Sequence, residues 1–127
     1  MNKPYTAARA SLLKAASAAA LTLAFGVQSA QAADASNGKV LADSHNCAAC
    51  HGVNLNKPVS PDYPKLAGQH ADYIFWALRQ YQMGNGNANF GRSNPIMQAQ
   101  VQSLSERDLK DLAAYVESLK GDLVEKK

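Results

Sequence analysis

The chain is 127 residues long, carries a formal net charge of +3 and contains two cysteines. This length fits one small domain, and two cysteines allow at most one disulfide, too few for a disulfide-stapled scaffold. The excess positive charge comes from Lys3, Arg9 and Lys14, because the ten basic residues after Ala32 are matched by ten acidic ones. The composition therefore gives no support for binding to nucleic acid or to an anionic membrane surface.

The first 32 residues have the form of a secretory signal peptide. Three basic residues are followed by an apolar stretch at residues 15–27, and the sequence AQA at residues 30–32 has the small-x-small form of a cleavage site. The apolar stretch is well short of the roughly 20 residues that span hydrocarbon, which argues against an uncleaved membrane anchor. We predict cleavage after Ala32, which leaves residues 33–127 as one domain in the periplasm, with no membrane span.

After this leader, residues 37–46 predict a short helix with a weak apolar pattern. The helix would deliver the motif CAACH, in which Cys47 and Cys50 are followed at once by His51. Residues 52–64 then carry three prolines and two asparagines, which break helices and favour turns. We predict a loop there.

Residues 68–84 give the strongest helical signal in the chain. They contain no proline and no internal glycine, and Ile74, Leu78 and Tyr81 recur on one face at helical spacing. Residues 84–95 are dense in glycine and asparagine and are predicted to form a second loop.

The last predicted helix begins after Ser105. The Ser105 hydroxyl can cap the helix, and the Asp108 side chain can accept a hydrogen bond from the Ser105 backbone, as in a capping box. Four leucine and valine residues follow at helical intervals, and Gly121 is a suitable end. No repeat and no strand-like alternation is present. The sequence therefore predicts an all-α fold.

The CAACH motif is open to three chemistries. A redox disulfide of the thioredoxin kind is expected beside a βαβ pattern, which is missing. A structural zinc site needs four ligands, and the further candidates, His45 and His70, do not form a second pair. Covalent haem attachment needs two thiols, an adjacent histidine and an exported chain, and all three are indicated. One haem c, held by Cys47 and Cys50 with His51 as iron ligand, is the prediction; the other two chemistries remain as alternatives.

In the order of its motifs, the chain after residue 32 resembles class I c-type cytochromes. The specific parts are the attachment motif and the Pro-x-Leu-x-Gly pattern of Pro64, Leu66 and Gly68. The helix DYIFWALRQY, a glycine-rich loop ending in NPIM and the segment LSERDLKDLAAYVESL follow in the family's order. The chain is most similar to a monohaem relative, or to one half, of the dihaem periplasmic cytochromes of subclass four.

This resemblance implies a class I cytochrome c fold, in which short helices wrap around one covalently bound haem. In such a fold the first helix packs against the last. We expect Gly38 or Ala42 to meet the face that bears Leu112 and Tyr115.

The resemblance also implies a methionine as the second iron ligand. After the leader only Met83 and Met97 remain. Met97 follows a loop and precedes Ser105 by eight residues, as the family's ligand methionine does, whereas Met83 ends a predicted helix. A thioether ligand raises the reduction potential. We therefore expect His51 and Met97 to hold the iron from its two sides.

Four further residues are expected around the haem. By resemblance, the backbone carbonyl of Pro64 accepts the second ring N–H of His51 and fixes the orientation of the ring. Tyr73 and Trp76 are candidates for contact with the haem face or a propionate, although plain core packing explains each equally well. Arg92, in the loop before Met97, could pair with a propionate through its planar guanidinium.

Iron held by protein on both sides has no open position for a substrate. The predicted function is therefore that of a periplasmic monohaem cytochrome that carries single electrons between redox proteins and is not an enzyme. We expect it to be a monomer. Two alternatives remain. The chain could be the cytochrome subunit of a larger periplasmic dehydrogenase, or a haem-based sensor or peroxidase-like protein if the sixth ligand is labile.

Overall fold

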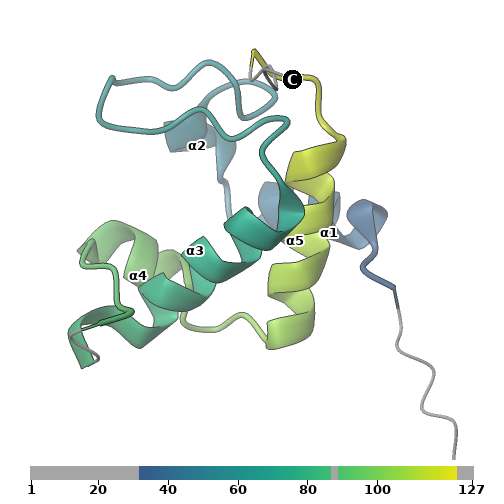
Figure 1. Ribbon diagram of the computed structural model, residues 1–127. Helices are drawn as coiled ribbons and strands as arrows, with labels where there is room; N and C mark the ends of the chain where they lie inside the picture. The colour runs from purple at the N-terminus through teal and green to yellow at the C-terminus, as the bar shows by residue number, and fades with distance from the viewer. Residues whose placement is uncertain (1–31, 87–88, 123–127) are drawn as a thin grey trace, which may run out of the picture. The chain divides into compact units, whose positions relative to one another are not determined.

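The computed structural model describes residues 32–86 and 89–122. Apart from Ala32, the predicted signal peptide lies outside these residues, so its cleavage stays a prediction. Figure 1 shows helices joined by loops, and the described residues contain no strand, only isolated bridges around Lys57. The all-α prediction is confirmed. The elements are α1 (Ala35–Ser44), α2 (Ala48–His51), α3 (Ala71–Met83), the 3-10 turn η1 (Gly84–Gly86), α4 (Pro95–Val101) and α5 (Glu106–Ser118).

Helix α1 packs closely against α5, and Gly38 makes this possible (Figure 1). A β-carbon at this position would run into the backbone of Asp111 and the side chain of Tyr115. One turn later, Ala42 is buried in the same cluster as Leu112. Both residues that were expected to meet the last helix therefore do so.

Helix α3 begins at Ala71 rather than at Gly68. His70 has an extended backbone, with a ψ of 134°, and offers no side-chain cap. Instead the Glu117 carboxylate of α5 accepts a hydrogen bond from the Ala71 N–H at 3.1 Å. The helix ends before Gly84, which takes a φ of 55° that glycine adopts readily.

Helix α5 has the predicted capping box. The Ser105 hydroxyl accepts a hydrogen bond from the Asp108 N–H at 3.1 Å, and the Asp108 carboxylate accepts one from the Ser105 N–H at 2.9 Å. The predicted end at Gly121 is wrong, because the helix stops at Ser118 and Leu119 is already extended, with φ −78° and ψ 142°.

Two short helices were not predicted. Helix α2 is a single turn formed by the motif itself. Helix α4 begins where a loop was expected to continue: Pro95 occupies its first turn, and the Asn94 side chain accepts a hydrogen bond from the Met97 N–H at 3.0 Å. Met97 consequently lies on a helix rather than at the end of a loop.

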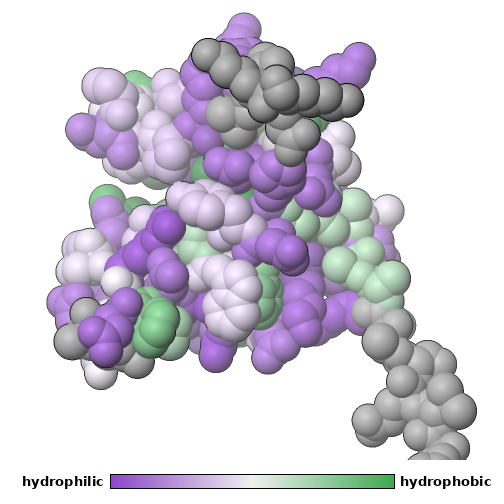
Figure 2. Space-filling model, in the orientation of Figure 1, coloured by the Kyte–Doolittle hydropathy of each residue, from purple (hydrophilic) through white to green (hydrophobic). Residues whose placement is uncertain are grey.

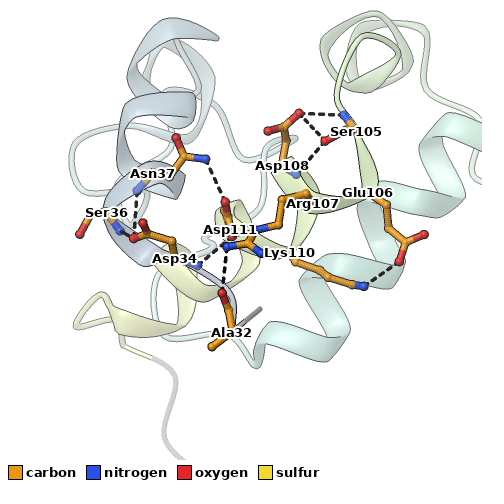
Figure 3. A network of polar contacts seen from close by, with 10 residues as sticks. All are labelled: Ala32, Asp34, Ser36, Asn37, Ser105, Glu106, Arg107, Asp108, Lys110 and Asp111. Carbon is orange, nitrogen blue, oxygen red and sulfur yellow. Dashed lines mark hydrogen bonds and ion pairs between the residues drawn. The ribbon is translucent and has the colours of Figure 1, made fainter. Parts of the chain in front are cut away.

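A buried carboxylate, Asp111, ties the start of α1 to α5 (Figure 3). It is 2% exposed and accepts hydrogen bonds from the Asp34 N–H at 2.7 Å, the Asn37 amide at 2.9 Å and Arg107 Nε at 3.0 Å. The Arg107 guanidinium also donates to the Ala32 carbonyl at 2.9 Å. Burial favours a higher pKa for the carboxyl, but these three donors outweigh it and hold the pKa of Asp111 below its usual value.

We expect Asp111→Ala to lower the free energy of unfolding by about 2–4 kcal/mol, because its donors lose their acceptor. The pKa of Asp111 is lower in the folded than in the unfolded chain. Its contribution is therefore fully present above the ordinary carboxyl pKa of about 4, and it is lost as the pH falls through the lower folded value. Denaturant titrations of the holoprotein between pH 7 and pH 3 measure both effects.

Lys39→Ala is the control, because the ion pair of Lys39 with Asp43 is exposed at both ends, by 60% and 66%. Its effect on the free energy of unfolding should be small, because exposed ion pairs contribute little to stability. An Asp111→Ala cost no larger than that of the control would contradict the role given to the buried carboxylate.

Candidate functional site

The motif residues face one cavity. Cys47 is the N-cap of α2, while Cys50 and His51 belong to the helix, and all three line the cavity. Gly52 ends the turn with a φ of 77°, and a β-carbon there would run into the backbone of Lys57. A glycine is therefore needed directly after the histidine for the chain to turn back across the site.

The cavity separates α2 and the loop that follows it from α3 and α4. Figure 2 shows the surface hollowed between the part that carries residues 52–66, at the top of the view, and the part with α3 and α4 below it. The walls are mainly apolar, so a group bound there would be shielded from water. The leucine, isoleucine and valine residues that line the cavity are Leu55, Leu66, Ile74, Leu78, Ile96, Val101, Leu104, Leu112 and Val116.

His51 is held in one orientation by the backbone. It is 6% exposed, and its Nδ1 lies 2.9 Å from the Pro64 carbonyl oxygen. A carbonyl can only accept, so Nδ1 carries the hydrogen and Nε2 keeps its lone pair. The Tyr63 ring lies beside the imidazole in a T-shaped arrangement, with ring centroids 6.3 Å apart. The hydrogen bond to Pro64 that the resemblance implied is present, and it leaves Nε2 free to bind a metal.

The two methionines of the described residues are placed differently. Met97 is half-buried in the first turn of α4 and lines the cavity, whereas Met83, the last residue of α3, does not. His45 also lines the cavity, but it caps the end of α1 two residues before Cys47. His70 is 64% exposed beside Glu117. Among these candidates, Met97 lies on a different wall from the motif.

Tyr73 and Arg92 line the cavity as expected, and they contact each other. The guanidinium carbon of Arg92 lies 5.5 Å from the centre of the Tyr73 ring and 5.6 Å from that of the Tyr81 ring, within the range of cation–π attraction. Hydrogen bonding to the Tyr73 hydroxyl raises the pKa of Arg92 further above its high ordinary value. A fixed positive charge therefore stands at the cavity wall, where an anionic group would be favoured.

Trp76 does not line the cavity. It is 58% exposed and packs edge-on against Phe75, with ring centroids 5.1 Å apart. Two residues along a helix correspond to about 200° of rotation, so Trp76 faces away from Ile74, which is buried on the cavity side. The expectation that Trp76 borders the haem has no support in the structure.

Three residues at the cavity were missed from the sequence. Tyr81 was assigned to the apolar face of its helix, and Tyr63 was placed in a loop without a role, yet both line the cavity. Asn94 lines it too while capping the helix that carries Met97. The dipeptide Asn94-Pro95 is a recognisable helix start that could have revealed this helix.

The two other chemistries of the motif gain no support. Burial raises the pKa of the Cys47 thiol, whereas the nucleophilic cysteine of a redox disulfide has a lowered pKa. In residues 32–86 and 89–122, no three His, Cys, Asp or Glu side chains are grouped as a bound metal ion would require.

Comparison with known proteins supports the assignment of this cavity as a haem site. The family described as "Cytochrome c" matches residues 35–120. The chain belongs to the cytochrome c family. With its attachment motif at Cys47, Cys50 and His51, this cytochrome carries one covalently bound haem c.

Several relatives are similar over most of this cytochrome. Cytochrome c4 of Stutzerimonas stutzeri is 39% identical over 94 residues, which cover 72% of this chain and 42% of that protein. Cytochrome c-553 of Helicobacter pylori is 36% identical over 91 residues, covering 72% and 86%. The crystal structure of reduced recombinant cytochrome c4 from Pseudomonas stutzeri superposes with a TM-score of 0.61 at 36% identity, covering 72% of this chain and 48% of that one.

These comparisons confirm a class I c-type cytochrome resembling cytochrome c4. The chain spans less than half the length of the cytochrome c4 that it matches, but most of the length of cytochrome c-553. The residues around the cavity fit a covalently bound haem. They offer two thiols for the thioether bonds, an imidazole with a free Nε2 and a thioether sulfur, and the walls are apolar.

The haem is expected to stay with the polypeptide after acid–acetone extraction, because two thioether bonds survive denaturation. The double variant Cys47→Ala with Cys50→Ala should lose it under the same treatment. Met83→Ala is the control, since Met83 does not line the cavity, and it should retain the haem. Haem that washes out of the unmutated protein would contradict the attachment.

Proposed function

We propose that this cytochrome carries single electrons between redox proteins in the periplasm, as a monohaem protein, after residues 1–32 have been removed. The observation that supports it best is that His51 and Met97 line the same cavity from α2 and from α4. None of the helices described here combines the length and the apolar character that crossing a membrane requires.

Each ligand has a separate task in this proposal. His51, fixed by Pro64, presents Nε2 to the iron, and Met97 presents its sulfur from the opposite wall. The bound haem supplies the one-electron chemistry, and a thioether ligand favours its ferrous state. A haem iron held by both residues would have no open position for a substrate, which favours electron transfer over a sensor or peroxidase role.

The mouth of the cavity is a suitable place for a redox partner. Tyr73 and Ile96 line the cavity and are each 50% exposed, so they form an apolar rim. Of the cationic side chains that line the cavity, Lys65 pairs with Asp122 at 2.6 Å, and Arg92 is the one expected to pair with a haem propionate. Docking is therefore expected to depend on the apolar rim, with charge as a modest correction.

Met97→Ala should open the iron to external ligands, whereas Met83→Ala should leave it closed, because only the first removes the proposed sulfur ligand. In the Met97 variant the thioether charge-transfer band of the ferric protein should be absent, the ferrous protein should bind carbon monoxide, and peroxidase activity should appear. Visible spectra and carbon monoxide titrations measure these effects. The opposite pattern in the two variants would reverse the ligand assignment.

Electron self-exchange between oxidised and reduced copies tests the rim without a known partner. From about 0.01 to 0.15 M ionic strength the Debye length falls from roughly 30 to 8 Å. The exchange rate, measured by NMR line broadening, should change only a few fold over this range. Ile96→Lys should slow the exchange about tenfold or more at low salt through like-charge repulsion at the contact.

Val40→Lys adds the same charge on α1, at a residue that is 63% exposed and does not line the cavity. It is the matched control and should have little effect. A fall of two orders of magnitude with salt in the unmutated protein, or equal effects of the two lysines, would contradict docking through the apolar rim.

A further inference from the structure

The segment that carries Met97 is hydrogen-bonded to α3 at both of its ends. Figure 1 shows α4 beside the C-terminal part of α3. At the start of the segment, the Arg92 backbone N–H donates to the Gln80 carbonyl at 3.0 Å. The Arg92 Nε also donates to Gln80 Oε1 at 2.8 Å. One residue of α3 therefore holds both the backbone and the side chain of Arg92.

At the far end of the segment the contact is made by Gln82. Its side-chain Nε2 donates to the Val101 carbonyl at 2.7 Å and to the Leu104 carbonyl at 2.8 Å. Val101 is the last residue of α4, and carbonyls at a helix end have no partner within the helix. The Val101 carbonyl accepts the Leu104 backbone N–H at 3.1 Å, and the Gln82 amide adds a second donor to it from another helix.

The orientation of this amide is fixed as well. Arg79 NH1 donates to Gln82 Oε1 at 2.7 Å. Because a guanidinium can only donate, it keeps the oxygen of the amide on its own side and directs the NH₂ group to the two carbonyls. Arg79 and Gln82 are neighbours on the surface of one helix, so the pair forms a prearranged donor.

We propose that Gln82, oriented by Arg79, is a positioning residue that keeps Met97 on the iron. This inference rests on the proposed role of Met97 as ligand. Met97 lies between the two attachment points, on a helix whose N-terminus is capped by Asn94. Gln102 Nε2 also donates to the Gln82 backbone carbonyl at 3.1 Å, a contact that does not need the Gln82 side chain. Removing the two bonds of the Gln82 amide would loosen the Val101 end and let α4 move away from α3 with the sulfur, while leaving the packing of α1 on α5 intact.

A positioning role predicts a change in ligand exchange that is separate from overall stability. Without Gln82 the carbonyls of Val101 and Leu104 lose the amide donor while Met97 stays in the closed arrangement, and the Val101 carbonyl keeps only the Leu104 N–H. Both carbonyls regain solvent when α4 moves. The loss of these hydrogen bonds therefore raises the free energy of the state in which Met97 binds the iron. Replacement of Met97 by an external ligand should become easier, even where the helices remain folded.

The test is imidazole binding to the ferric holoprotein, followed through the thioether charge-transfer band. Gln82→Ala should bind imidazole about tenfold more tightly than the unmutated protein, given the usual cost of removing a hydrogen-bond donor from buried carbonyls. Arg79→Ala, which keeps the amide but frees it to rotate, should show a smaller change in the same direction. The helical circular dichroism of both variants at 25 °C should equal that of the unmutated protein.

Ser103→Ala is the matched control, because Ser103 is exposed between the same two carbonyls, and its imidazole affinity should stay within about twofold of the unmutated value, as for surface substitutions in general. Equal affinities in Gln82→Ala and Ser103→Ala would overturn the inference. If Gln82→Ala loses both the band and its helical circular dichroism, Arg79→Ala decides instead. An imidazole affinity of folded Arg79→Ala equal to that of Ser103→Ala would then overturn the inference. Absence of the band from the unmutated protein would instead count against Met97 as the ligand.

Discussion

The close packing of α1 on α5 is the constraint on which the site depends. It is possible because Gly38 brings α1 against the backbone of α5, and the buried Asp111 carboxylate fixes the start of α1 at the same place. The end of α1 leads directly into the motif, where the Cys47 N–H donates to the Ala42 carbonyl at 3.0 Å. Helix α5 at the same time contributes Leu112 to the cavity wall. One helix crossing therefore positions both the attachment residues and part of the apolar pocket.

The two sides of the cavity are held by different kinds of interaction. The motif side is covalently attached to the haem, and His51 is oriented by a single backbone carbonyl that follows 13 residues later. The opposite side carries no covalent attachment and is held to α3 by side-chain amides and by Arg92. A difference of this kind assigns a permanent ligand to one side and an adjustable one to the other. Under the proposed ligation, these contacts of the Met97 side with α3 would keep the iron closed to substrates.

Local signals account for what the sequence predicted correctly. The spacing of Cys47, Cys50 and His51, the capping box at Ser105 and the periodic face of α3 each lie within a few residues, and the structure contains all three elements. Helix α4 was missed because only its N-terminal signal, Asn94-Pro95, is local, and a seven-residue helix has no periodic face long enough to recognise.

The remaining features depend on residues far apart in the chain. Gln82 meets carbonyls 19 and 22 residues away, and Asp111 accepts a hydrogen bond from a residue 77 positions earlier; no spacing in the sequence indicates either contact. For Trp76, a residue type alone suggested a role that the structure does not support. Its residue type favoured a role at the haem, but the rotation of α3, set by the burial of Ile74 and Ala77, places it on the outer face.

The central claim is that one chain closes the iron from both sides, with nitrogen from His51 and sulfur from Met97. X-ray absorption at the iron edge of the reduced protein tests it most directly, because sulfur and nitrogen scatter differently in the first coordination shell. The account predicts a sulfur scatterer beside the nitrogens, and its loss in Met97→Ala but not in Met83→Ala. A first shell without sulfur in the unmutated protein, or one that keeps its sulfur when Met97 is removed, would contradict it.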